Sequence, residues 1–385
     1  GSGLRVRPNS QLLDVLVNIT EYPTPILGGF DREFLALPEE VLVTVMQHHQ
    51  KYFSFEDENG RLAPHFLAVM NIADDVDGVV RHGNERVLRA RFNDARFFWE
   101  TDQKRPLARR VDDLQHVTFH KDLGTYYDKT QRNVEGVRRL GGNEHALRAA
   151  LLAKCDLTTE LVKEFTELQG VVGGLYARAQ GEPEEVALAI YDQYEPVPRT
   201  RTGQILALAD RLDTLENFFR LGLMPTGSRD PFALRRAALG VARILIEGRH
   251  ELPVPADLRD FVLDRVRYYF REVRGYRYDE INAVLAAGSD QLPDAADRLE
   301  AVSRVRLTPD FEPLAASFKR IRNILRQANF TSAASPDPAL LEPGPERDLY
   351  AEAQRIRQAT QGLSYQEALA AIATLRPRVD LFFDK

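Results

Sequence analysis

The chain has 385 residues, which is long enough for two or three domains that each bury a core. Apolar residues make up 44% and charged residues 28% of the sequence, as is ordinary for a soluble globular protein, and the net charge of −6 argues against indiscriminate binding to polyanions. The single cysteine excludes a disulfide framework, and no apolar run reaches the ~18 residues of a membrane span. We therefore expect a cytoplasmic protein that does not enter a membrane.

Residues 1–80 predict a small α/β region. Pro38-Glu39-Glu40 indicates a helix start, and Glu58-Asn59-Gly60 has the composition of a hairpin turn. Three runs rich in β-branched and aromatic residues indicate strands, at 41–46, 52–55 and 66–70.

Residues 81–250 predict a helical domain, because apolar side chains recur there at spacings of three and four. Glycine and proline mark loops at 139–143 and 181–183, and Leu252-Pro253-Val254-Pro255 ends the domain. The segment 81–110 has nine lysines and arginines against four acidic residues, a local excess that suits phosphate groups. Arg89 and Arg91 are candidates for such contacts.

Residues 251–385 predict a second set of helices, interrupted by a Ser-, Pro- and Gly-rich loop at 331–345. The helix predicted at 315–327 has two faces. Its apolar face consists of Leu314, Phe318, Ile321 and Leu325. Its basic face consists of Lys319, Arg322 and Arg326, with no acidic residue between them. A solvated surface is the ordinary explanation of such a face, and a surface for RNA phosphates is the functional one.

The segment 209–241 carries the most information. Asp230-Pro231 predicts a helix start, because Asp caps free N–H groups and Pro at the first helical position gives up no hydrogen bond. Arg235 and Arg236 follow as consecutive residues, so they point about 100° apart on a helix, and we expect one to face a carboxylate while the other faces outward. Both are candidates for RNA contacts.

Residues 222–240 closely resemble the segment G-x-x-P-x-G-x-x-D-P-F-A-L-R-R-A-A-L-G of the beta subunit of bacterial heterotetrameric glycyl-tRNA synthetase. Five more segments resemble motifs of this family in the same order, at 46–53, 83–98, 123–125, 154–157 and 165–170. The resemblance covers essentially the whole chain. It implies a mainly α protein with a small α/β N-terminal piece, an HD-like helical domain and an anticodon-binding-type helical bundle. It also implies that the chain is a fragment, with further family sequence on both sides.

The family resemblance implies a division of labour between two subunits. The alpha subunit holds the active site for ATP, Mg²⁺ and glycine, and the beta subunit binds tRNA(Gly). This agrees with the sequence, which has no phosphate-binding glycine loop, dinucleotide fingerprint or Ser-His-Asp spacing. We therefore expect no catalytic residue and no cofactor in this chain. A scaffold that binds only the alpha subunit remains an alternative.

The helical middle also contains pieces of an HD-type metal site. Phosphohydrolases with such a site use one His, an adjacent His-Asp pair and a further Asp to hold a metal that activates water. The corresponding residues here are His116 or His120, the pair Cys155-Asp156, and Asp210. Because Cys155 stands where the paired His should be, we expect a degenerate site without metal, with both carboxylates serving as caps or ion-pair partners. A metal-dependent phosphohydrolase is the alternative function.

Overall fold

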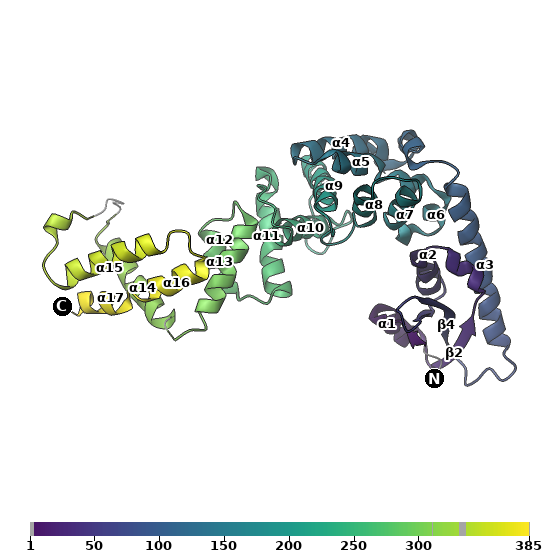
Figure 1. Cartoon of the computed structure of the whole chain (residues 1–385), viewed down its shortest axis with the longest axis horizontal. Helices are drawn as coiled ribbons and strands as arrows, with labels where there is room; N and C mark the ends of the chain where they lie inside the picture. The colour runs from purple at the N-terminus through teal and green to yellow at the C-terminus, as the bar shows by residue number, and fades with distance from the viewer. Residues whose placement is uncertain (1–3, 310, 331–335, 385) are drawn as a thin grey trace. The chain divides into compact units, whose positions relative to one another are not determined.

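The computed structural model describes residues 4–309, 311–330 and 336–384 (Figure 1). The chain forms two compact units, Gly1–Gly240 and Val241–Lys385. Helices dominate both units, and the four-stranded sheet belongs to the first, so the prediction of a mainly α protein with a small α/β N-terminal piece is confirmed. Among the described residues, no helix is long and apolar enough to cross a membrane.

The N-terminal part of the first unit is built on an antiparallel sheet with the strand order β1-β3-β4-β2. Its strands are β1 (Arg5–Val6), β2 (Thr24–Gly29), β3 (Phe53–Glu56) and β4 (Leu62–Met70). Helix α1 (Ser10–Ile19) covers one face, where Leu12 and Leu16 pack against Phe53. Side chains of the other face, including Phe66, join the main core of the unit.

Two of the three predicted strands are confirmed, as β3 and the second half of β4. Gly60 turns the hairpin between them with φ of +75°, a conformation that glycine adopts readily. The strand predicted at 41–46 is wrong. This segment forms α2 (Glu39–Thr44) and a π-helical turn (Val45–His49), because its buried residues recur at helical spacing. The β-branched composition was outweighed by this packing.

The rest of the first unit is helical except for one short hairpin, β5 (Thr118–His120) and β6 (Gly124–Thr125), which the sequence did not predict. Helix α3 lies beside β2 (Figure 1). The helices are α3 (Val79–Asp102), α4 (Tyr126–Arg139), α5 (Glu144–Leu152), α6 (Glu160–Glu164), α7 (Val171–Ala179), α8 (Glu184–Tyr191) and α9 (Arg201–Arg220). Both predicted loops are confirmed, since they separate α4 from α5 and α7 from α8.

One hydrophobic core runs from Phe34 to Ala209 through the sheet region and the helices of the first unit. The unit boundary falls inside α10 (Leu234–Glu247). The finer division of the chain at residues 80 and 250 stays a prediction.

The second unit contains helices and no strand among its described residues. After α10, the predicted break at 252–255 is confirmed as a non-helical segment. The helices that follow are α11 (Arg259–Tyr268), α12 (Tyr278–Ala286), α13 (Leu292–Val305), α14 (Phe311–Gln327), α15 (Pro345–Ala359), α16 (Tyr365–Ala373) and α17 (Arg376–Phe383). Val266, Phe270 and Leu299 are fully buried and form part of its interior. The first residues of the predicted loop, 331–335, lie outside the described residues.

Candidate functional site

Helices α4 and α9 pack closely, and this contact builds the most highly charged interior of the first unit. A side chain at Gly136 of α4 would place its Cβ atom only 3.2 Å from the Cβ of Ala209 on α9, so glycine suits this close approach. Both helices start at fixed points, because Thr125 and Thr200 cap their first free N–H groups. The polar residues of the two helices are thereby held face to face.

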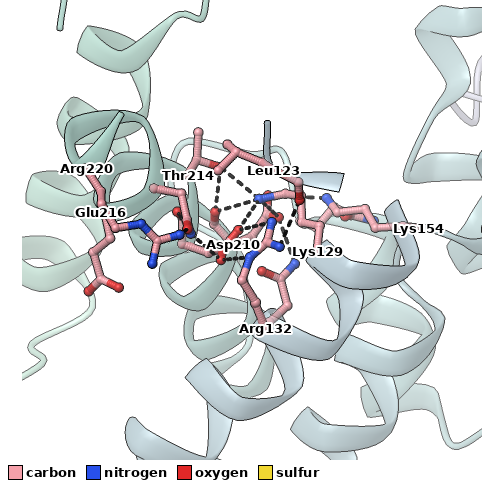
Figure 2. A network of polar contacts seen from close by, with 12 residues as sticks. Leu123, Lys129, Arg132, Lys154, Asp210, Thr214, Glu216 and Arg220 are labelled. Atoms are coloured by element: carbon pink, nitrogen blue, oxygen red, sulfur yellow. Dashed lines mark hydrogen bonds and ion pairs between the residues drawn. The ribbon is translucent and has the colours of Figure 1, made fainter. Parts of the chain in front are cut away.

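The Asp210 carboxylate lies between two buried ammonium groups (Figure 2). Its oxygens are 3.2 Å from Lys129 Nζ and 3.2 Å from Lys154 Nζ, and Asn133 donates a hydrogen bond of 2.8 Å. Burial alone would raise the pKa of Asp210, but the charges of Lys129 and Lys154 outweigh it and hold this pKa below its usual range. Asp210 is therefore ionised.

Asp213, one turn further along α9, completes the pairing of the cations. It lies 3.0 Å from Lys129 Nζ and 2.6 Å from Arg132 Nε. Arg132 also donates to the Leu123 carbonyl at 3.2 Å, and Lys129 donates to the Thr214 hydroxyl at 2.8 Å (Figure 2). The network therefore reaches the loop before α4, and its ammonium and carboxylate groups are satisfied internally.

Lys154 is held by polar groups as well as by Asp210. Its Nζ donates 2.8 Å hydrogen bonds to the Gln193 side-chain carbonyl and to the Tyr194 hydroxyl. The Lys154 side chain is only 2% exposed. With three partners, this ammonium group has no free donor for a ligand.

The predicted HD-type residues do not form a metal site. Among the described residues, no group of three or more His, Cys, Asp and Glu side chains is arranged to hold a metal ion. Two ammonium groups occupy the surroundings of Asp210, and they would repel a divalent cation. The residues present therefore do not fit the metal of an HD-type phosphohydrolase, and we derive no metal chemistry from them.

Most of the other HD-type candidates pack in the protein interior or bond to its backbone. Cys155 is fully buried, and burial raises the pKa of its thiol far above the usual value, so it behaves as a small apolar side chain. His120 packs its ring against Phe218 at 5.2 Å between centroids, and His116 ends a 3-10 turn. Asp156 is fully buried and accepts a 2.5 Å hydrogen bond from the Gly170 N–H.

Asp156 should make stability depend on pH. Burial raises its pKa from 3.8 to about 6, against the lowering effect of the Gly170 hydrogen bond. A raised folded-state pKa means that its contribution is complete below pH 3.8 and is lost as the pH rises through 6, by at most about 3 kcal/mol. Asp156→Asn should abolish this loss. Urea unfolding of the wild type and the variant between pH 4 and pH 7 measures this loss of stability. Equal changes of stability with pH in the two proteins would contradict the raised pKa of Asp156.

The network contains several residues that sequence reasoning missed: Lys129, Arg132, Lys154 and Asp213. Lys154 directly precedes the predicted pair Cys155-Asp156, which was the available signal. A single lysine in a helix ordinarily indicates solvent exposure, so the sequence around Lys129 gave no signal that this residue is buried in a network.

The basic segment 81–110 is largely paired with carboxylates. Arg89 lies 3.1 Å from Asp31, and Arg91 lies 3.0 Å from Glu164. Three further arginines of the segment form ion pairs: Arg96, Arg105 and Arg110. The RNA contacts of Arg89 and Arg91 stay predictions, and such contacts would compete with these ion pairs.

Arg235 and Arg236 differ in their surroundings, as expected. The Arg235 guanidinium donates a 2.7 Å hydrogen bond to the Gly227 carbonyl, so its partner is a backbone oxygen rather than the expected carboxylate. Arg236 is exposed. Asp230 caps the N–H groups of Leu234 and Arg235 as predicted, but α10 begins at Leu234, so Pro231 is not its first helical residue.

The predicted helix at 315–327 is confirmed within α14, and its basic residues lie at the surface. Lys319, Arg322 and Arg326 are exposed, and Arg326 hydrogen-bonds Asn323 at 3.3 Å. The expected apolar face is not buried: Phe318 is 54% exposed and Leu325 is 42% exposed. The side chain of Leu314 lies outside the described residues.

Comparison with known proteins assigns the chain to a family. The family model described as glycyl-tRNA synthetase beta subunit matches residues 1–286. The glycine–tRNA ligase beta subunit of Acidobacterium capsulatum is 51% identical, and the comparison covers all of this chain and 61% of the relative. The beta subunit of Syntrophus aciditrophicus is 40% identical over 99% of this chain and 60% of the relative. The chain thus spans about 60% of the length of these relatives. The resemblance seen in the motifs is therefore confirmed: the chain belongs to the glycyl-tRNA synthetase beta subunit family.

Proposed function

We propose that this chain is the tRNA-binding part of a glycyl-tRNA synthetase beta subunit. In this role it supports the ATP-dependent attachment of glycine to tRNA(Gly) by the alpha subunit of a cytoplasmic heterotetramer. The observation that carries the proposal is the 51% identity to a glycine–tRNA ligase beta subunit along the whole chain. ATP and Mg²⁺ belong to the alpha subunit, and this chain contributes no catalytic residue.

Within this proposal the helical domain at 81–250 is an HD-like fold whose metal chemistry has been lost. The support is local: Lys129 and Lys154 neutralise Asp210 where a metal would otherwise be required to do so. Asp210 of α9 is paired with Lys129 of α4 and with Lys154, which precedes Cys155. These ion pairs hold the three segments together without a bound metal ion. The same two ammonium groups weigh against the alternative of a metal-dependent phosphohydrolase.

The bundle at 251–385 is the proposed anticodon-binding-type domain. Its support is the exposure of α14, where Lys319 and Arg322 have no ion-pair or hydrogen-bond partner for their side chains among the described residues. Both cations are free to contact phosphates, and the Arg322 guanidinium can also stack on unpaired bases.

The chain alone should not activate glycine. Purified protein with ATP, glycine and Mg²⁺ should give no glycine-dependent exchange of pyrophosphate into ATP, because the proposal places this chemistry on the alpha subunit. The mixture of this chain with the alpha subunit should show the exchange, and it serves as the positive control. Exchange by the isolated chain at a rate similar to that of the mixture would contradict the proposal.

A further inference from the structure

The turn before α10 is held rigidly by its own polar groups. Thr226 and Arg229 exchange two backbone hydrogen bonds, of 3.1 and 2.9 Å. The Arg235 guanidinium donates a hydrogen bond to the Gly227 carbonyl. The Asp230 carboxylate accepts hydrogen bonds from the N–H groups of Leu234 and Arg235 at 2.8 and 2.9 Å. The backbone positions from which the turn presents its side chains to solvent are therefore fixed.

Phe232 is the exposed member of a cluster of tilted and edge-on aromatic rings. Its ring centroid lies 4.3 Å from that of Phe218 and 5.6 Å from that of His120. Phe218 is only 3% exposed and also contacts Phe119, whereas Phe232 is 37% exposed. The buried Phe218 ring supports Phe232, and the exposed part of the Phe232 side chain can meet a further planar group.

Three weakly paired cations lie within four residues of these rings along the chain: Lys121, Arg229 and Arg236. Lys121 directly follows His120; its side chain is 84% exposed and lies 3.9 Å from Asp122, its ion-pair partner. Arg229 and Arg236 are exposed, and their guanidinium groups have no ion-pair or hydrogen-bond partner in the described part of the chain. The nearby Asp230 is used as a helix cap. The segments that carry the rings therefore hold exposed positive charge, although the whole chain carries a net charge of −6.

We propose that this surface is a subsite for an unpaired nucleotide of RNA. The base stacks on Phe232, and the adjoining phosphates meet Arg229, Arg236 and Lys121. Single-stranded RNA is recognised by this combination of a ring platform and cations, and the stacking tolerates any base because every base has a π-face. The inference rests on the proposed function, in which tRNA supplies the unpaired nucleotides. It also accounts for the family segment around Phe232. Asp230 caps α10, Phe232 offers its exposed ring, Arg235 bonds the turn, and Arg236 is left for the ligand.

A tryptophan placed at the platform reports stacking directly. Phe232→Trp in the full chain should lose fluorescence when an eight-nucleotide single-stranded RNA or a tRNA transcript is added, because a stacked base quenches the indole. The matched control is Tyr22→Trp, since Tyr22 is also a surface aromatic residue, is 60% exposed and lies outside the segments predicted to contact RNA. Both variants retain Trp99, so its signal cancels in the comparison. Equal quenching in the two variants would overturn the subsite.

The cations are tested by affinity. The double variant R229Q/R236Q should bind the tRNA transcript about 10-fold to 100-fold more weakly at ~0.1 M salt, with a log–log salt slope smaller by roughly two. The control R138Q/R178Q removes the same charge from arginines that pair with Glu135 and Glu184, and it should bind nearly as the wild type does. Circular dichroism checks that each variant is folded.

The two proposals fail in different ways. If the wild-type chain binds tRNA and R229Q/R236Q binds it equally well with an unchanged salt slope, the subsite is wrong and the proposed function stands. If Phe232→Trp is quenched by the alpha subunit and by no RNA, the surface belongs to a protein partner and the subsite is wrong. If the wild-type chain binds no tRNA, the proposed function fails and the subsite fails with it.

Discussion

Replacing Asp210 by alanine should lower the free energy of unfolding by about 3–5 kcal/mol, because it leaves buried ammonium groups without their carboxylate. Lys154 loses its only ion-pair partner within the described residues, and Lys129 keeps Asp213 alone. The side chains of Lys129 and Lys154 are 4% and 2% exposed, so water cannot replace the lost partner. Urea unfolding at pH 7 measures the change.

The pH dependence gives this prediction a second readout. Because the pKa of Asp210 lies below its usual 3.8 in the folded protein, its contribution is present above that pH and is lost as the pH falls below it. The difference between wild type and Asp210→Ala should therefore persist from neutral pH to about pH 4 and shrink in stronger acid. The control Asp122→Ala removes a half-exposed carboxylate 3.9 Å from Lys121 and should change stability by less than about 1 kcal/mol. Equal effects of the two substitutions would show that the network contributes little.

Replacing Lys319, Arg322 and Arg326 together by glutamine should weaken tRNA binding by roughly 10²-fold at ~0.1 M salt, if each contacts a phosphate. The log–log salt slope should fall by roughly one to three units, because fewer counterions are released on binding. The melting temperature should change little, since all three side chains are exposed. Fluorescence anisotropy with labelled tRNA over a salt series measures both binding quantities.

The second unit offers a control of equal charge. Arg355, Arg376 and Arg378 are ion-paired with Glu352, Asp380 and Asp348, so their guanidinium groups are already compensated. The variant R355Q/R376Q/R378Q should reduce affinity less than the α14 variant does. Equal losses in the two variants would mean that net charge alone acts, and an unchanged α14 variant would make this face an ordinary solvated surface.

The sequence by itself determined the family and the local structure that depends on near neighbours. The ordered motifs identified the family, the turn at Gly60 followed from its composition, and the cap at Asp230 followed from the chemistry of a free helix start. Asp210 and Cys155 were predicted to be members of a degenerate site because the expected His is absent from the sequence, and this stays a prediction. These inferences need only residues a few positions apart or a fixed pattern.

The tertiary structure decided what depends on partners distant in the chain. The segment after Glu39 is helical because its apolar residues face one core, which outweighs their β-propensity. The ions of the Asp210 network come from α4, α9 and the segment before Cys155, and the packing of α4 against α9 brings Lys129 to Asp210. Phe318 has the spacing of a core residue, yet α14 leaves it half exposed. Whether a side chain is buried depends on which other elements pack against it. Neither the spacing of apolar residues nor the residue type specifies those elements.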